Sequence, residues 1–111
     1  MNYHEYKACI DACNECVVIC NHCLSSCLKE EDVNKMAGCI RLDSECIIVC
    51  KAAVDLMSTG SQHVAPICQL CADVCNACAE ECQKHDNDHC RECAEVCRRC
   101  AEECESMATH V

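Results

Sequence analysis

The stretch CADVCNACAEEC, residues 71 to 82, decides the fold because its cysteines stand at positions 71, 75, 78 and 82. Their alternating steps of four and three average about 3.5 residues, the repeat of the buried seam of a helix packed in a bundle. A half-buried strand would alternate at every second residue, and no segment of the chain does so. The stretch therefore predicts a helix that turns thiols toward its neighbours, where most proteins have leucine.

The same cysteine stripe recurs in three further segments, so the 19 cysteines of the chain fall into four blocks. The blocks contain Cys9, Cys13, Cys16, Cys20, Cys23 and Cys27; Cys39, Cys46 and Cys50; Cys68, Cys71, Cys75, Cys78 and Cys82; and Cys90, Cys93, Cys97, Cys100 and Cys104. Turn-forming residues separate the blocks near 28–32, 57–66 and 83–90. Short connections make neighbouring helices antiparallel, so we expect an all-α, up-down-up-down four-helix bundle with a cysteine-lined core. Its helices are predicted to be about 20 to 25 residues long, and residues 1–111 form a single domain.

The composition indicates a core built largely from sulfur. Only 20 residues are Val, Ile or Leu, and the chain has no Phe or Trp. Cysteine is among the most buried residue types, so thiols are expected to fill much of the interior. Packing alone is a poor reason for 19 cysteines in register, because alanine, valine or leucine would pack without the risk of oxidation.

Charge and hydropathy exclude several classes of partner. A net charge of −10 makes nucleic-acid binding improbable, and no apolar run approaches the roughly 20 residues that span a membrane. No secretory signal precedes the first cysteine, so we expect a cytoplasmic protein with reduced thiols. A disulfide scaffold is the main alternative, but the cysteine count is odd and Gly and Pro together number only three.

Phased thiols on four helices predict a site for many soft metal ions. Residues three or four apart on a helix lie close enough for their sulfurs to converge on one ion. Thiolates select Cu(I), Zn(II) or iron–sulfur clusters. Several zinc–Cys₄ sites in one dry tube would repel each other, whereas Cu(I) with shared thiolates leaves the tube nearly neutral. Two alternatives stay open: a general zinc buffer, and a thiol redox protein with one or two exposed, reactive cysteines.

The alternation of C-x-x-x-C and C-x-x-C on four helices, over almost the whole chain, resembles the bacterial copper storage proteins, in the branch without an export signal. This resemblance implies a cytosolic, non-enzymatic store that holds multiple Cu(I) ions as its cofactor, with the 19 cysteine thiolates as ligands. It also implies a homotetramer. Copper chaperones or small-molecule thiols are the expected exchange partners.

The resemblance further implies that Met or His residues at one open end of the tube receive copper. Alternating helices place the first and third turns at the same end, which gives Met36, His85 and His89 as entry candidates. The alternative for these histidines is a plain solvent-exposed position. The opposite end, with Met57 and His63 among its residues, is the competing mouth.

The first two predicted helices have two further features, an aspartate among the cysteines and a second, apolar stripe. Asp43 falls on the cysteine stripe, either inside the core or at its flank with Leu42 turned inward. We favour the flank, because an unpaired buried carboxylate is costly. A second, apolar stripe runs beside the thiols and packs partly within the bundle, and its excess suggests an oligomer interface. This stripe contains Ile10, Val17, Leu24, Ile40, Ile47 and Val54.

Overall fold

A computed structural model describes residues 3–109, which form four α-helices and no strand. The helices are α1 (Lys7–Leu28), α2 (Ala37–Thr59), α3 (Val64–Cys82) and α4 (Asp88–Ala108), with short 3₁₀ helices η1 (Tyr3–Tyr6) and η2 (Val33–Met36) before α1 and α2. Helix lengths of 22, 23, 19 and 21 residues agree closely with the expected range. Among the described residues, no helix combines the length and the apolar character needed to cross a membrane.

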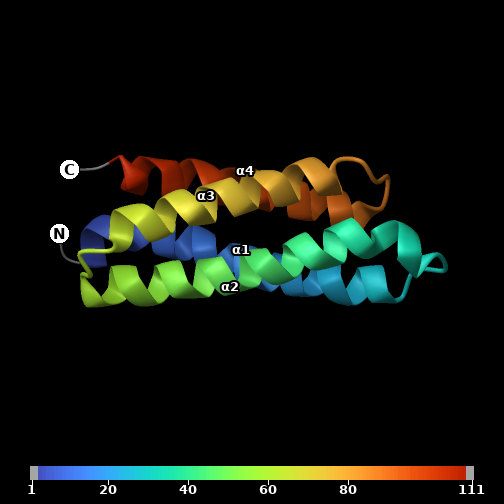
Figure 1. The fold of residues 1–111 in the computed structure, drawn as a ribbon, viewed down its shortest axis with the longest axis horizontal. Helices are drawn as coiled ribbons and strands as arrows, with labels where there is room; N and C mark the ends of the chain where they lie inside the picture. Colours follow the sequence, from blue (N-terminus) through green and yellow to red (C-terminus); the bar gives the residue numbers. More distant parts are fainter. Residues whose placement is uncertain (1–2, 110–111) are drawn as a thin grey trace.

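The four helices run alternately up and down the long axis of a rod measuring 47 × 18 × 17 Å (Figure 1). The main packing contacts join α1 with α2, α2 with α3, α3 with α4, and α4 with α1. This closed ring of neighbours surrounds a single core along the axis of the rod. The α1–α2 and α3–α4 connections lie at one end of the rod, and the α2–α3 connection lies at the other (Figure 1). The predicted four-helix bundle is confirmed.

The α2–α3 connection uses local turn chemistry. Gly60 ends α2 with φ 68° and ψ 36°, a left-handed conformation that glycine adopts without a Cβ clash. The backbone N–H of Ser61 then donates to the carbonyl of Leu56 at 3.0 Å. The Ser61 hydroxyl oxygen accepts the backbone N–H of His63 at 2.9 Å, and α3 begins at the next residue. These bonds satisfy backbone groups that a helix end leaves without partners.

The inward faces of the helices are made of cysteine with a few small or flexible side chains. All 19 cysteines are buried, and 18 of them are fully inaccessible. Four alanines are fully or almost fully buried beside them: Ala53, Ala72, Ala79 and Ala101. The expected sulfur-rich core is therefore present, with branched aliphatic side chains packed around it.

The expectation that Asp43 lies at a flank is wrong. Its side chain is fully buried, while the neighbouring Leu42 is only half-buried. Asp43 keeps the phase of the stripe between Cys39 and Cys46, and two thiols from other helices provide hydrogen bonds to its carboxyl group. Those bonds offset part of the cost of burial that argued against this position.

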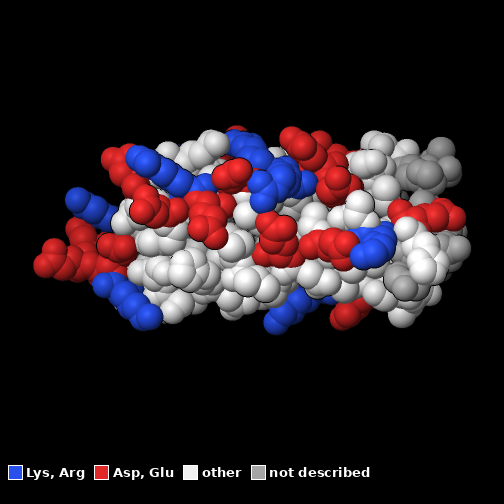
Figure 2. Space-filling model, turned by 180° about the vertical axis from the view of Figure 1, so that it is seen from behind, with Lys and Arg blue, Asp and Glu red and all other residues white. Residues whose placement is uncertain are grey.

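Charge is distributed unevenly over the outside of the rod. Figure 2 shows, on the side opposite to the view of Figure 1, a band of mixed charges with a paler, less charged area below it. The predicted apolar stripe of α1 and α2 is half-buried along the helix contacts. Two residues next to it face outward instead: Val18 is 65% exposed and Ile48 is 67% exposed.

Candidate metal centre

The thiols of the core lie in van der Waals contact along the bundle axis. Sulfur–sulfur distances of 3.6 Å join Cys9 to Cys104 and Cys50 to Cys71, and 3.8 Å joins Cys16 to Cys97. All 19 cysteines lie within residues 3–109, and none of them forms a disulfide. A disulfide bond is about 2 Å long, so these distances are contacts between separate thiols. The disulfide scaffold is therefore not the structure of this chain.

Several sets of ligand atoms lie close enough together to surround one metal ion, and their members overlap. Within each set, every ligand atom lies within 4.8 Å of the others. Four all-sulfur sets are Cys13, Cys71, Cys100 and Cys104; Cys16, Cys20, Cys46 and Cys97; Cys16, Cys50, Cys75 and Cys100; and Cys20, Cys78, Cys93 and Cys97. Cys16, Cys20, Cys97 and Cys100 each belong to two of these sets. The geometry therefore favours sulfurs that bridge neighbouring ions over separate, closed sites.

Shared sulfurs bear on which ion the core can hold. A zinc ion needs four thiolates of its own, and each such site keeps two surplus negative charges in a region without water. A monovalent ion that shares bridging thiolates balances one charge per sulfur. The overlapping sets therefore suit many Cu(I) ions better than a row of zinc ions.

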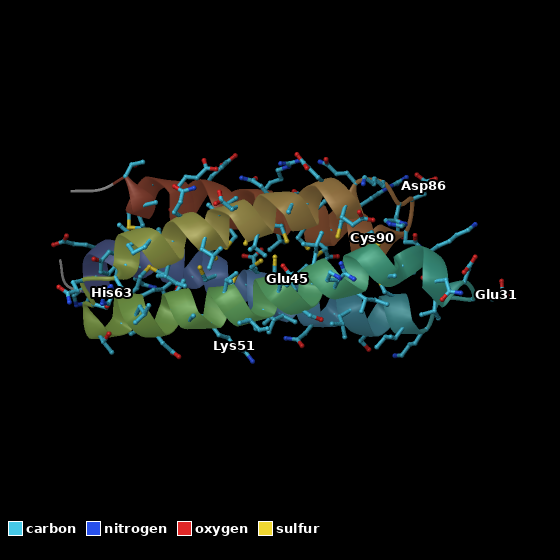
Figure 3. The ribbon with its side chains drawn as sticks, viewed as in Figure 1. Glu31, Glu45, Lys51, His63, Asp86 and Cys90 are labelled. Carbon is cyan, nitrogen blue, oxygen red and sulfur yellow. The ribbon has the colours of Figure 1, made fainter. Side chains whose placement is uncertain are left out.

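One end of the core includes a histidine within reach of three thiols. His89, in the first turn of α4, has a side chain only 12% exposed. Its Nδ1 lies 3.5 Å from Cys90 Sγ, 3.6 Å from Cys23 Sγ and 3.9 Å from Cys27 Sγ. These four residues form a further candidate ligand set, with nitrogen as one of the donors. Figure 3 shows Cys90 toward the end of the rod that has the α1–α2 and α3–α4 connections. His89 therefore does not have the solvent-exposed side chain that was the alternative for these histidines.

The second histidine of this end, His85, is held by a carboxylate. Its Nε2 lies 3.3 Å from Glu81 Oε2, and its side chain is 16% exposed. Gly38 on α2 makes room for that carboxylate, because a Cβ at this position would lie 2.7 Å from Glu81 Cδ. Hydrogen bonding from Cys82, helped by the positive potential of His85, lowers the pKa of the Cys39 thiol to about 7. The lowered pKa favours the ionised, metal-binding form of Cys39 at this end.

The pKa of the Cys27 thiol, at the same end, shifts in the other direction, because burial raises it to about 11.

The remaining entry candidate, Met36, is the last residue of η2 and is 4% exposed. Met36 thus belongs to the buried core at the end where the two histidines lie. The structure brings all three entry candidates to one end, as the alternation of helices predicted.

The opposite end of the core is covered by apolar side chains. Met57 is fully buried, and Tyr6 and Val64 are 7% and 5% exposed. His4 and His63 are exposed, and Figure 3 shows His63 at this end of the rod. His110 lies outside the described residues. At this end of the described chain, His4 and His63 are thus accessible to solvent.

Asp43 is the one polar side chain within the thiol core of the described residues. Its Oδ1 accepts hydrogen bonds from the thiols of Cys78 at 3.3 Å and Cys93 at 3.2 Å, while Oδ2 has no partner. Burial, which disfavours the charged form, raises the pKa of this carboxyl to about 8. Asp43 is therefore mostly protonated at neutral pH, and it places an oxygen donor among the sulfurs.

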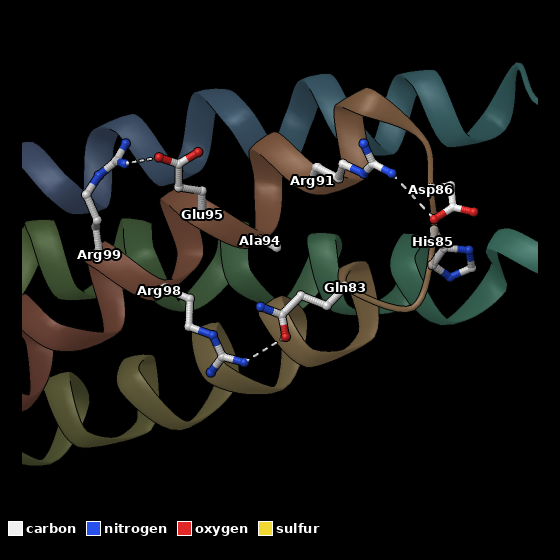
Figure 4. Close-up of a pocket in the computed structure, with 8 residues that line it drawn as sticks. All are labelled: Gln83, His85, Asp86, Arg91, Ala94, Glu95, Arg98 and Arg99. Carbon is white, nitrogen blue, oxygen red and sulfur yellow. Dashed lines mark hydrogen bonds and ion pairs between the residues drawn. The ribbon is translucent and has the colours of Figure 1, made fainter.

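A groove of about 750 Å³ lies on the outside of α4 and the α3–α4 connection, where His85 but no cysteine lines it (Figure 4). Its three arginines have partners in the protein. Arg91 pairs with Asp86 and Arg99 pairs with Glu95 and Glu15, while Arg98 donates to the side-chain oxygens of Asn76 and Gln83. Each of the three guanidinium groups thus has a partner within the protein.

Sequence reasoning misplaced one acidic residue of the site and missed two others. Asp43 was placed at the flank, and Glu30 and Glu81 were not identified as partners of histidines. The four-residue spacing of Glu81 and His85 on one helix is a signal that could have indicated their pairing. No local signal connects Glu30 with His89, which lies 59 positions away.

Comparisons with known proteins agree with this geometry. A family model described as copper storage protein matches residues 2–109. An uncharacterised cysteine-rich protein of Bacillus subtilis, YhjQ, is 53% identical over 83 residues, which cover 75% of this chain and 77% of that protein.

Two solved structures share the fold. The Cu(I)-bound copper storage protein BsCsp3 is 52% identical, with a TM-score of 0.90 over 97% of this chain and 100% of that one. A cytosolic copper storage protein from Streptomyces lividans, with five coppers, is 36% identical, with a TM-score of 0.92 over 98% of this chain and 96% of that one.

Replacing Asp43 with asparagine tests the buried carboxyl group in the metal-free protein. The folded-state pKa lies above the value of 3.8 expected for the unfolded chain, so the folded protein binds the extra proton between about pH 4 and pH 8. Stability must therefore fall as pH rises through this window, by an amount on the order of a few kcal/mol. Asp43→Asn removes that loss, so its advantage over the wild type should grow with pH.

The measurement is thermal unfolding followed by circular dichroism, without oxygen, at several values between pH 5 and pH 9. Both proteins share the same 19 cysteines, so a pH-dependent difference between them reports on the Asp43 carboxyl group and its contacts with Cys78 and Cys93. The exposed Asp55 on α2 provides a matched control as Asp55→Asn. A difference between Asp43→Asn and wild type that stays constant with pH would contradict a raised pKa.

Proposed function

The chain belongs to the copper storage protein family, and we propose that it takes up and holds many Cu(I) ions on its cysteine thiolates. The observation that carries the proposal is the overlap of the four-sulfur sets, in which one thiol serves two neighbouring sites. The Cu(I) bound by BsCsp3, which is 52% identical, supports the choice of ion. All 19 cysteines are proposed as ligands, within one domain that spans residues 1–111.

Binding is a ligand exchange. An incoming Cu(I) ion leaves its donor, two or more core sulfurs bind it, and the protons of those thiols are released. Because the ion replaces protons in a region without water, the net charge of the core changes little as it fills. We propose storage and not catalysis, since a buried, shared ligand set offers no open coordination position for a substrate.

We propose that copper enters at the end with His85, His89 and Met36. Two largely buried histidines and a thiol whose pKa is lowered to about 7 lie there, next to the outermost sulfurs. The other end is covered by Tyr6, Met57 and other apolar groups. We infer a cytosolic protein, in keeping with the relative from Streptomyces lividans, with copper chaperones or small thiols as sources of the ion.

A titration with Cu(I) under anaerobic conditions tests the stored amount. We expect helical circular dichroism before any metal is added, and saturation close to one copper per thiol, near 19 per chain. Helicity should stay constant because the sulfurs are already in place. Zn(II) should compete poorly and reach about four or five ions at most, since each needs four ligands of its own. A copper plateau at four or five ions per chain would favour the zinc-like alternative.

We further propose that α1 and α2 form the contact between copies of the chain in a homotetramer. Val18 and Ile48 lie at corresponding positions of the two repeated segments ECVVIC (15–20) and ECIIVC (45–50), and both are about two-thirds exposed. Large apolar side chains with this exposure on adjacent helices are typical of an interface.

Light scattering of the metal-free protein tests this contact. The wild type should have the mass of several chains at micromolar concentration, and the double variant Val18→Glu, Ile48→Glu should have a lower mass at unchanged helicity. Leu70→Glu, at a 49% exposed residue of α3, is the matched control and should assemble like the wild type. A wild type with the mass of one chain, or a double variant that assembles normally, would contradict the proposed interface.

A further inference from the structure

Glu30 contacts His89, the histidine at the proposed copper entry, on the side of the ring opposite to the thiols. It lies in the connection between α1 and α2, and its Oε1 is 3.0 Å from His89 Nε2. Nδ1, on the other side of the same ring, faces the sulfurs of Cys23, Cys27 and Cys90 at 3.5 to 3.9 Å. The imidazole thus stands between one carboxylate and three thiols. Its side chain is 12% exposed and that of Glu30 is 36% exposed, so the pair lies at the boundary between core and solvent.

The chemistry of the two partners determines which ring nitrogen is the donor. An ionised carboxylate has acceptor oxygens only, so the nitrogen that faces it must have the proton. A neutral imidazole has a single N–H, and a proton on Nε2 leaves the lone pair on Nδ1. That lone pair is then directed at the three sulfurs. In the other tautomer a nitrogen lone pair would face the carboxylate oxygen, which is unfavourable.

We propose that Glu30 is a positioning residue for copper entry: it holds His89 in the Nε2–H tautomer, with Nδ1 presented to the first Cu(I) ions at the mouth. The proposal rests on the copper storage proposed above. A carboxylate behind a histidine is a common way to fix the ring and raise its basicity toward a metal. Here the carboxylate comes from the α1–α2 connection and the ring from α4, so the same bond also ties these elements together at the mouth.

Three variants separate positioning from simple attraction of a cation. Glu30→Ala removes the acceptor and the charge, whereas Glu30→Gln removes the charge and keeps an acceptor oxygen for the Nε2–H group. Glu31→Ala removes a neighbouring carboxylate that projects from the tip of the connection (Figure 3). Circular dichroism and the final copper content should match the wild type in all three.

The first measurement is the tautomer of His89 in the metal-free protein, by ¹⁵N NMR of the imidazole ring. The second is the rate at which the first equivalents of Cu(I) leave a chromophoric chelator, by stopped-flow absorbance. We expect the Nε2–H form in the wild type, Glu30→Gln and Glu31→Ala. Glu30→Ala should show mixed tautomers and take up copper about tenfold more slowly. In a His89→Ala background, Glu30→Ala should cause no further slowing.

The outcomes that overturn the proposal are distinct. Glu30→Gln could take up copper as slowly as Glu30→Ala while both variants keep the wild-type tautomer. That result would mean that the charge of Glu30 attracts copper and that Glu30 does not position the ring. Slowing by Glu30→Ala that persists without His89 would show a role independent of the histidine. Equal rates at full copper content would leave storage intact and reject positioning. Low copper content in every variant and in the wild type would instead reject storage, while the tautomer would still report on the pair.

Discussion

The structure depends on one constraint, which is that sulfurs from four helices meet along a single axis from which water is excluded. Burial of so many thiols is possible because a protonated thiol is small and nearly apolar. The same groups become soft anionic ligands when a metal replaces their protons. Packing and binding thus use the same atoms at the same positions, and the sulfurs need to move little between the two states.

Charge then limits what such a core can accept. The spacing of 3.6 to 3.9 Å between many sulfurs forces neighbouring ions to share ligands, and shared ligands favour a monovalent ion. Asp43 also meets this limit on charge in the core. A carboxyl group that is mostly protonated at neutral pH adds an oxygen to the core without adding an uncompensated charge. The acidic surface, by contrast, stays in water, where its charges are screened.

Sequence reasoning could predict the bundle, its turns and the inward phase of the cysteines, because these follow from spacing within each helix. The end at which the two histidines lie was predictable from the alternation of the helices. Asp43 was misplaced because its partners, Cys78 and Cys93, come from α3 and α4, and the cost of burying a lone carboxylate looked decisive. The Glu30–His89 pair depends on the relative placement of a connection and a distant helix, about which local spacing has no information.

The two ends of the rod differ, since one has histidines in contact with thiols or carboxylates and the other has apolar cover. Ions that enter at the first end should therefore meet overlapping ligand sets at once. X-ray absorption at the copper edge, on protein loaded with only a few Cu(I) ions per chain, tests this sharing directly. The account predicts sulfur neighbours together with a nearby second copper even at this low loading. Copper ions surrounded by sulfur with no copper neighbour at any loading would contradict it.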